Sequence, residues 1–279
     1  MGFQLWYSKN TGIRRNGTTF EEIQNIFIDN ITTRFIYEPL ACCKLNDNPF
    51  EVRRTLEERD FDLLGVIDNE ENKIGYVEKE KLSVDISIEE CYSNFDFNEI
   101  IAESTPLSEL FTILENRESA FILKGNNISG IVTRADVNKP VVRIYLFGLI
   151  SLFEMNLNFW IKHFFQDESW KESLKKERID AAEDLLVIRR GDNLDLELLE
   201  CLQFCDKRDI LRKSNDFIGK FEFASKPKFE KLMRRVETIR NEIAHSQNSI
   251  IANLDWTDFV QCIKQMQSFL VKSEIEIEK

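Results

Sequence analysis

Few side chains in this 279-residue sequence are suited to binding a metal, because it contains only two histidines and six cysteines. The cysteines form no CxxC pair, and Cys201 and Cys205, one helical turn apart, have no histidine near them in the sequence. Zinc sites and disulfide frameworks show denser and more regular ligand spacing. The sequence therefore predicts no metal site and reduced thiols, as is typical of a cytoplasmic protein.

Long apolar runs are also missing. The most apolar stretch is IYLFGLISLF at 144–153, only ten residues long, whereas a membrane-spanning helix needs about 20. The first ten residues, MGFQLWYSKN, lack the basic flank and apolar core of a secretory signal. We therefore expect a buried helix at 144–153, no membrane partner and a cytoplasmic location.

The chain does have enough apolar residues for one large or two ordinary domains, because 43% of it is hydrophobic and 22 residues are Phe. Its net charge of −12 is uneven: residues 1–140 have 15 basic and 25 acidic residues, and residues 141–279 have 22 and 24. Residues 205–240 reverse the trend with 11 basic and 6 acidic residues. This segment fits either a phosphate-binding patch or a solvated helix face of mixed charge.

The first half contains an internal repeat. TLEERDFDLLGVIDNEENKIGYVEKEKL (55–82) and ILENRESAFILKGNNISGIVTRADV (113–137) each read as a helix end, a strand, a polar turn and a second strand with a glycine. Proline-containing helix starts precede both copies, in NDNPFEV and ESTPLSEL. We expect two paired units of α and β structure, at about 35–85 and 97–140.

Beyond Pro140 the pattern becomes helical. Apolar residues recur with helical periodicity over 141–165, roughly 169–190, 194–213, 227–246 and 255–273. The fold class expected is therefore an α+β N-terminal domain over 1–140, followed by an all-α helical bundle over 141–279. The Lys-Pro pair at 139–140 marks the boundary, although the first helix can also start there at once and join the domains stiffly.

The sequence GIVTRADV, which starts at Gly130, resembles CBS domains. The resemblance implies a CBS pair with an adenine-nucleotide site, in which Thr133 meets phosphate and Asp136 holds the ribose, with Thr105 as a weaker candidate. The implied regulatory ligand is AMP, ADP or ATP. The alternative is structural: Thr133 caps the helix that follows, and Asp136 lies in its first turn.

The first repeat departs from this pattern. Aligned on Gly75, it has Glu78 in place of the hydroxyl and Lys81 in place of the ribose-binding carboxylate. A phosphate would face a carboxylate here, so we expect this site to be empty.

The segment RNEIAHSQ, which starts at Arg240, ends a helix with a clear apolar stripe. On a helical wheel the arginine falls within that stripe, which consists of Phe229, Leu232, Met233, Val236, Ile239 and Ile243. A guanidinium on a core face is costly unless it is paired. Asn241 and His245, four residues apart, share another face.

This Arg-Asn-x-x-x-His arrangement resembles the HEPN family. The resemblance implies a metal-independent endoribonuclease whose composite active site forms across a homodimer, with Arg240, Asn241 and His245 in the site. A histidine can move the 2′-hydroxyl proton of RNA, and an arginine can stabilise charge on the phosphorane. Glu154, a polar residue within an apolar helix, is expected to orient the arginine. The alternative is an Arg240–Glu237 ion pair and a histidine that only caps the helix end.

Together these features predict a dimeric ribonuclease gated by an adenine nucleotide, of the kind used in stress response or anti-phage defence. One alternative is a non-catalytic nucleotide-sensing regulator or scaffold, in which the helical domain only dimerises or binds a partner. Another is a toxin neutralised by a separate antitoxin or regulatory protein.

Overall fold

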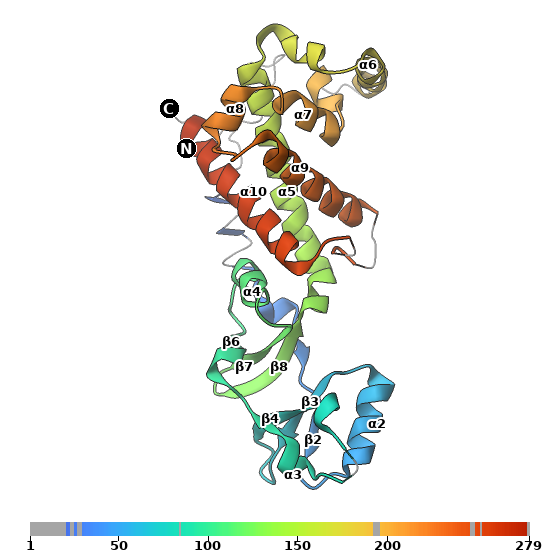
Figure 1. Ribbon diagram of the computed structural model, residues 1–279, viewed down its shortest axis with the longest axis vertical. Helices are drawn as coiled ribbons and strands as arrows, with labels where there is room; N and C mark the ends of the chain where they lie inside the picture. Colours follow the sequence, from blue (N-terminus) through green and yellow to red (C-terminus); the bar gives the residue numbers. More distant parts are fainter. Residues whose placement is uncertain are drawn as a thin grey trace. The chain divides into compact units, whose positions relative to one another are not determined.

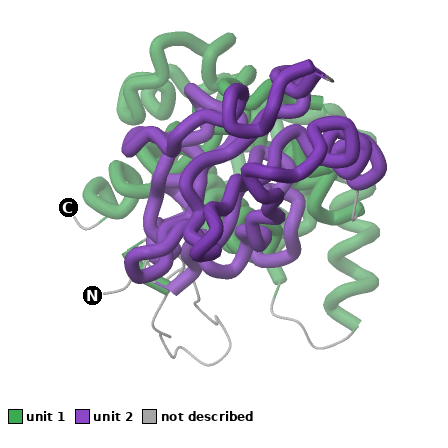
Figure 2. Tube along the Cα trace, turned by 90° about the horizontal axis from the view of Figure 1, so that it is seen from below, with its two compact units in different colours: residues 1–27, 142–279 green, residues 28–141 purple. Residues whose placement is uncertain are grey.

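The computed structural model of the chain describes residues 21–22, 25–26, 30–83, 85–191, 196–245, 249–251 and 253–277. The first ten residues, for which no secretory signal is expected, lie outside this set. The chain divides into two compact units (Figure 2): an N-terminal unit, Ile28–Val141, and a helical unit that contains Val142–Lys279. The division falls beside the Lys-Pro pair at 139–140.

The N-terminal unit contains two four-stranded sheets (Figure 1). The first has the order β2-β3-β4-β5, with the strands Cys42–Lys44, Leu63–Ile67, Lys73–Glu78 and Ser93–Asn94. The second has the order β1-β8-β7-β6, with the strands Glu38–Pro39, Asn127–Thr133, Ser119–Lys124 and Ile100–Ala102. In each sheet one neighbouring pair is parallel (β2 with β3, β6 with β7) and the other two pairs are antiparallel.

The two sheets repeat one another with their edge strands exchanged. When β2, β3 and β4 are matched to β6, β7 and β8, the fourth strand β5 corresponds to β1. β5 follows the first repeat in the chain, whereas β1 precedes it and crosses to the sheet of the second repeat. The internal repeat predicted from the sequence is thus present, and both copies carry a register shift in the same central hairpin.

The two repeat glycines lie where an edge strand approaches closely. Gly130 pairs with Pro39 of β1, and Gly75 pairs with Asn94 of β5. A Cβ atom on Gly130 would lie within 3 Å of the Glu38 carbonyl oxygen, and one on Gly75 would clash with the carbonyl of Ser93. Glycine is needed at both positions because backbone fills the space that a side chain would take.

Each repeat covers its sheet with one main helix. α2, Pro49–Arg59, begins with proline in its first turn, and the Asn48 side chain accepts a hydrogen bond from the Phe50 amide at 2.9 Å. α4, Leu107–Ile113, follows Pro106 and buries three apolar residues on one face: Leu107, Leu110 and Phe111. Short helical segments complete the unit: η1 Thr33–Phe35, η2 Lys79–Lys81, α3 Ile88–Cys91, η3 Phe97–Glu99 and η4 Arg134–Asn138.

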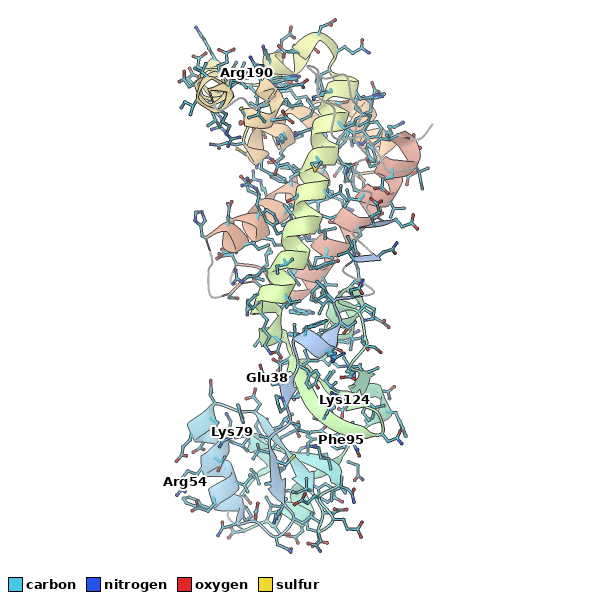
Figure 3. The ribbon with its side chains drawn as sticks, turned by 180° about the vertical axis from the view of Figure 1, so that it is seen from behind. Glu38, Arg54, Lys79, Phe95, Lys124 and Arg190 are labelled. Carbon is cyan, nitrogen blue, oxygen red and sulfur yellow. The ribbon has the colours of Figure 1, made fainter. Side chains whose placement is uncertain are left out.

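The core of this unit contains an aromatic cluster drawn from both repeats. Tyr76, Phe95 and Phe121 have ring centroids 4.7 to 6.0 Å apart, and Phe95 is labelled in Figure 3. Burial and the nearby charge of Glu99 raise the pKa of Tyr76 to about 12. The cluster packs the two repeats against each other as one body.

The helical unit consists of α-helices and short 3-10 segments. They are α5 Pro140–Phe164, η5 Gln166–Ser173, α6 Lys176–Arg190, η6 Leu198–Cys201, α7 Phe204–Leu211, α8 Asn215–Lys220, α9 Lys226–Ala244 and α10 Trp256–Ile277. α5 begins at Pro140, so Lys139 alone separates it from η4. The expected helices at 141–165, 227–246 and 255–273 correspond to α5, α9 and α10, although residue 246 lies outside the described residues.

Two of the expected helices are broken. The prediction at 169–190 is wrong for its first turns, because η5 ends at Ser173, the backbone of Leu174 and Lys175 is extended, and α6 starts only at Lys176. The prediction at 194–213 is also wrong, because Gln203 forms a capping box with Asp206 that starts α7 afresh. Residues 192–195 lie outside the described residues. The sequence pattern also missed α8, which Ser214 caps.

The core of the helical unit forms around α5, which packs along α10 (Figure 1). Trp160 donates a hydrogen bond to Ser273 at 2.6 Å, and Ser273 donates to Asn156 at 2.6 Å, so these buried polar groups satisfy one another. Among the described residues, α5 is the one helix long and apolar enough to cross a membrane by length and composition. Much of it is buried inside this unit, as in the core helix of a bundle: Val142, Tyr145, Leu146, Leu149, Ile150, Leu152, Phe153, Asn156, Leu157, Trp160 and Ile161.

Candidate functional site

Thr133 and Asp136 lie at the turn from β8 into η4. The Asp136 side chain is buried, and its Oδ2 accepts hydrogen bonds from the Thr133 amide at 2.7 Å and the Thr133 hydroxyl at 3.2 Å. This is a capping box, with each residue satisfying the backbone of the other. The structural alternative considered for this pair is therefore present, and the same geometry holds the hydroxyl and the carboxylate side by side.

A lysine that the sequence pattern did not single out completes this arrangement. Lys139 Nζ lies 2.8 Å from Asp136 Oδ1 and 2.5 Å from Oε1 of Glu38, and it also donates to the Ile36 carbonyl. Burial by itself would lower the pKa of Lys139, but the hydrogen bonds and charges of Asp136 and Glu38 outweigh burial and raise it. Glu38, labelled in Figure 3, lies on β1, at the edge of the same sheet as Thr133.

Thr105 lies in the turn between β6 and α4, where its carbonyl accepts a hydrogen bond from the Thr33 amide at 2.9 Å. The strand before it ends beside Leu123, whereas Thr133 pairs with Ser119 at the other end of β7. The sheet therefore does not place Thr105 beside Thr133. Gly130 is three residues before Thr133 on β8, and its close contact is with β1.

In the first repeat, the two residues that depart from the nucleotide-binding pattern pair with each other. Glu78 and Lys81 form an ion pair, and Lys81 also donates a hydrogen bond to the Ser93 hydroxyl of β5 at 3.1 Å. A carboxylate and an ammonium thus occupy the positions that Thr133 and Asp136 hold in the second repeat.

In the helical unit, Arg240 is not in the core, so the placement from the helical wheel is wrong. Its side chain is 45% exposed, and Ile243 is only partly buried. The wheel assumes that the core covers the whole helix, but the last turn of α9 is not covered. The buried arginine of α9 is Arg235, 8% exposed, which forms an ion pair with Asp258 of α10.

Glu154 of α5 lies beside Arg240, as expected. Its Oε2 is 3.7 Å from Arg240 Nε, and its Oε1 is 2.5 Å from the ammonium of Lys207 on α7. Lys207 is only 2% exposed. One carboxylate therefore joins a buried lysine to an exposed arginine, and sequence reasoning missed the lysine because α7 is far from α5 in the chain.

His245 and Asn241 are both exposed at the end of α9. His245 is the C-cap residue, and its amide donates to the Asn241 carbonyl at 2.9 Å. The alternative pairing of Arg240 with Glu237 is not what the structure shows, because Glu237 pairs with Arg208 at 3.5 Å. Arg240 and His245 are thus both open to a ligand from solvent.

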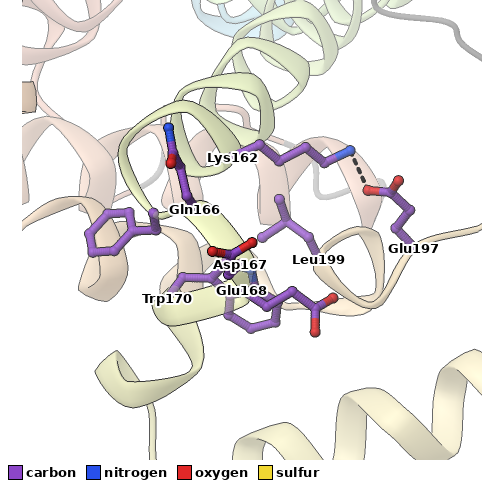
Figure 4. A pocket seen from close by; sticks show the side chains of 8 residues that line it. Lys162, Gln166, Asp167, Glu168, Trp170, Glu197 and Leu199 are labelled. Atoms are coloured by element: carbon purple, nitrogen blue, oxygen red, sulfur yellow. Dashed lines mark ion pairs between the residues drawn. The ribbon is translucent and has the colours of Figure 1, made fainter.

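A shallow pocket of about 180 Å³ lies at the junction of α5, η5 and η6 (Figure 4). Lys162 and Glu197 form an ion pair across it, and Trp170 lies in its wall. None of the residues predicted to form a site lines it. Within the described residues, no group of three or more His, Cys, Asp or Glu side chains could hold a metal ion.

Part of the chain matches a known family. Residues 99–142 match the family model of the CBS domain. They contain β6, α4, β7, β8 and η4, so the second repeat is a CBS domain. The first repeat has the same strand order, which supports the predicted pair.

Solved structures, CBS proteins among them, show low overall similarity to this chain. An uncharacterised conserved protein of Pyrococcus horikoshii is 21% identical, with a TM-score of 0.35, over 39% of this chain and 90% of its own. The CBS domains of a transcriptional regulator of Streptococcus pneumoniae are 20% identical, with a TM-score of 0.34, over 39% and 98%. CBSX2, a CBS-pair protein of Arabidopsis thaliana, was solved in complex with AMP and is 17% identical, with a TM-score of 0.35, over 40% and 97%. No curated protein sequence matched the chain.

Proposed function

We propose that this protein is a sensor of adenine nucleotides whose second CBS repeat carries the ligand site. The observation that carries the proposal is the buried Asp136 carboxylate, held beside the Thr133 hydroxyl within the segment that matches the CBS domain. A carboxylate accepts the two hydroxyl protons of a ribose, and a hydroxyl and the backbone amides of a strand-to-helix turn donate to phosphate. We expect one site per chain, because in the first repeat an ion pair between Glu78 and Lys81 stands where the second repeat has the Thr133 hydroxyl and the Asp136 carboxylate.

Calorimetric titration of the full chain with AMP, ADP and ATP tests this proposal. We expect about one site per chain for at least one of these nucleotides. The Asp136→Asn variant should bind about 5- to 150-fold more weakly, the range for loss of a charge-assisted hydrogen bond of about 1–3 kcal/mol. Asp85→Ala, which removes an exposed aspartate of the first repeat, is the matched control. Unchanged affinity in Asp136→Asn, or two equal sites, would refute this assignment.

We further propose that the helical unit is a metal-independent endoribonuclease of the HEPN type, with an active site shared across a homodimer. The exposed Arg240 and His245, five residues apart at the end of α9, support this proposal, and Glu154 lies where it can orient the arginine. The histidine would transfer the proton of a 2′-hydroxyl, and the arginine would stabilise charge on the phosphorane. One chain supplies only one copy of each group, so two chains would complete the site. Nucleotide bound to the CBS pair would then regulate cleavage.

Incubation of the full chain with single-stranded RNA in EDTA tests the catalytic part. The expected products carry 2′,3′-cyclic phosphate ends, and the rate should differ between nucleotide-free and nucleotide-saturated protein. Wild-type chains mixed with Arg240→Ala chains test whether the site is shared. An inactive dimer that still binds nucleotide would favour the non-catalytic regulator or scaffold instead, and activity restored by removing a bound protein would favour the toxin.

A further inference from the structure

The structure divides the basic segment 205–240 into buried and exposed side chains. Lys207 and Arg235 are buried and pair with Glu154 and Asp258, so their charges are neutralised within the helical unit. The exposed basic residues lie at the end of α7 and along α9, two helices that pack against each other (Figure 1). They are Arg212, Lys213, Lys228, Lys231, Arg234 and Arg240.

One face of α9 carries basic and polar side chains from its second turn to its end. Lys231, Arg234, Thr238, Asn241 and His245 follow one another at intervals of three or four residues, so they lie on the same side of the helix. Four of them are exposed and Thr238 is partly exposed. We call these five residues the outer face of α9. At a rise of about 1.5 Å per residue, this face is about 21 Å long.

The carboxylates beside the outer face are paired with arginines of α7 and its C-terminal end. Glu230 lies 3.0 Å from Arg212 and 2.7 Å from Arg234, and Glu237 lies 3.5 Å from Arg208. Hydrogen bonds from Arg234 and Arg212 lower the pKa of Glu230. Because one carboxylate faces two guanidinium groups, this cluster keeps a positive charge.

Three lysines next to this cluster increase its charge. Lys213, Lys228 and Lys231 are exposed, and none of them has an ion-pair partner among the described residues. With Arg212 and Arg234 there are five basic residues against the single carboxylate of Glu230, a local charge of +4 in a protein of net charge −12. A solvated face of mixed charge would balance its charges. The excess favours the other alternative for this segment, a patch that binds phosphates.

The outer face of α9 ends at the residues of the proposed ribonuclease site. Asn241 and His245 are its last two members, and Arg240 precedes Asn241 in the chain. A chain of phosphates held by Lys231 and Arg234 would therefore continue along the helix to the histidine. Single-stranded RNA supplies such a chain, because its phosphates repeat along the strand and bind positively charged surfaces.

We infer that the outer face of α9, together with the end of α7, binds the phosphate backbone of single-stranded RNA and directs it to Arg240 and His245. This inference rests on the proposed ribonuclease function and adds the surface that holds the substrate. Lys231 and Arg234 lie about four and three turns before His245. They set the affinity for RNA and take no part in proton transfer.

Fluorescence anisotropy with a labelled single-stranded RNA tests the inference, with His245→Ala in every protein so that the RNA stays intact. The further change Lys231→Glu/Arg234→Glu should weaken binding at least about tenfold. The slope of log affinity against log salt should become smaller by about 1.4, because two phosphate contacts are lost. Lys175→Glu/Lys176→Glu, at two exposed lysines where α6 begins, changes the net charge equally. This control should bind within about twofold of the parent protein.

Every outcome decides for or against this surface. No RNA binding by the parent protein, or equal losses in the two charge-reversed proteins, would refute it. Binding to phosphatidylserine vesicles but not to RNA would assign the charge to a lipid surface and also refute it. If Lys231→Glu/Arg234→Glu does not fold, as judged by circular dichroism, Lys231→Gln/Arg234→Gln takes its place, with an expected loss of about three- to tenfold and the same change in slope.

A cleavage assay separates this inference from the proposed function. RNA binding that depends on Lys231 and Arg234, without cleavage by the wild-type chain, would refute the ribonuclease and keep the surface. Cleavage by wild type with an unchanged KM in Lys231→Glu/Arg234→Glu would keep the ribonuclease and refute the surface.

Discussion

The ammonium of Lys207 lies 2.5 Å from Oε1 of Glu154 and is almost completely shielded from water. A buried ammonium is stable only while its partner carboxylate is charged and in place. The second oxygen of the same carboxylate faces Arg240. The position of the exposed arginine therefore depends on an ion pair in the core of the helical unit.

Glu154→Gln should lower the free energy of unfolding by about 3 kcal/mol, because it leaves the Lys207 charge buried without a counterion. Chemical denaturation monitored by circular dichroism measures this change. Glu197→Gln is the matched control, since its partner Lys162 is half-exposed, and it should cost less than about 1 kcal/mol. Adding Lys207→Met to Glu154→Gln should recover part of the loss. If the two glutamine variants lower the free energy of unfolding equally, the Glu154 carboxylate is not needed to compensate the buried charge of Lys207.

Arg240→Ala and His245→Ala should each abolish RNA cleavage and change the free energy of unfolding by less than about 1 kcal/mol, because both side chains are exposed. A cleavage assay in EDTA and a thermal melt measure the two effects. Arg54→Ala, at an exposed arginine of α2, is the control and should cleave like wild type. Full activity in either variant would remove the residue from the proposed site.

Gly130→Ala should destabilise the N-terminal unit by about 1–3 kcal/mol, since the new methyl group would meet the Glu38 carbonyl and the Tyr37 ring. Urea denaturation, followed by the near-ultraviolet signal of the aromatic cluster, measures this loss. Gly219→Ala is the control, because its new Cβ meets no atom within 4 Å. In a helix that change should be neutral or stabilising by about 0.5–1 kcal/mol. A neutral result at Gly130 would mean that β1 is not held against β8.

The contribution of Lys139 to stability should disappear at alkaline pH. Its pKa is raised in the folded protein, so the stabilisation is fully present below the ordinary lysine pKa of about 10.4 and is lost as the pH rises through the folded-state value. The stability difference between wild type and Lys139→Met, about 1 kcal/mol at pH 8, should shrink as the pH rises above about 10.4 and through the raised pKa of Lys139. Lys44→Met, at an exposed strand residue, controls for general alkaline destabilisation. A difference that stays constant with pH would rule out the ion pair as its source.

Local sequence patterns predicted the elements that local interactions determine. The repeat could be found because Gly75 and Gly130 meet the same backbone restriction, and α9 because its apolar residues follow a helical period over its whole length. The breaks at Leu174 and Gln203 were missed because extended backbone at one and a capping box at the other interrupt those helices, with no change in the hydrophobic period.

The rest of the site depends on contacts between distant parts of the chain. Glu38 and Lys139 are 101 residues apart, and β1 is only two residues long, too short for any periodicity to reveal it. The exposure of Arg240 was mispredicted for a similar reason, since a helical wheel describes one helix and not what covers it. Asp136 was found because the hydroxyl and the carboxylate lie three residues apart in one turn.

Because β1 and β5 are exchanged, the edge strand of each sheet comes from a segment outside the repeat that forms the rest of the sheet. A fragment that starts after Lys44 would contain all of the second repeat and still leave β8 without its neighbour, with one row of unpaired amide and carbonyl groups open to another strand. Such a fragment would also lack Glu38, so that Lys139 would have no acceptor on the edge strand. The pair of repeats is therefore the smallest piece of this unit in which both sheets are complete, and β1, a strand of only two residues, covers the edge of β8 that would otherwise be open to another strand.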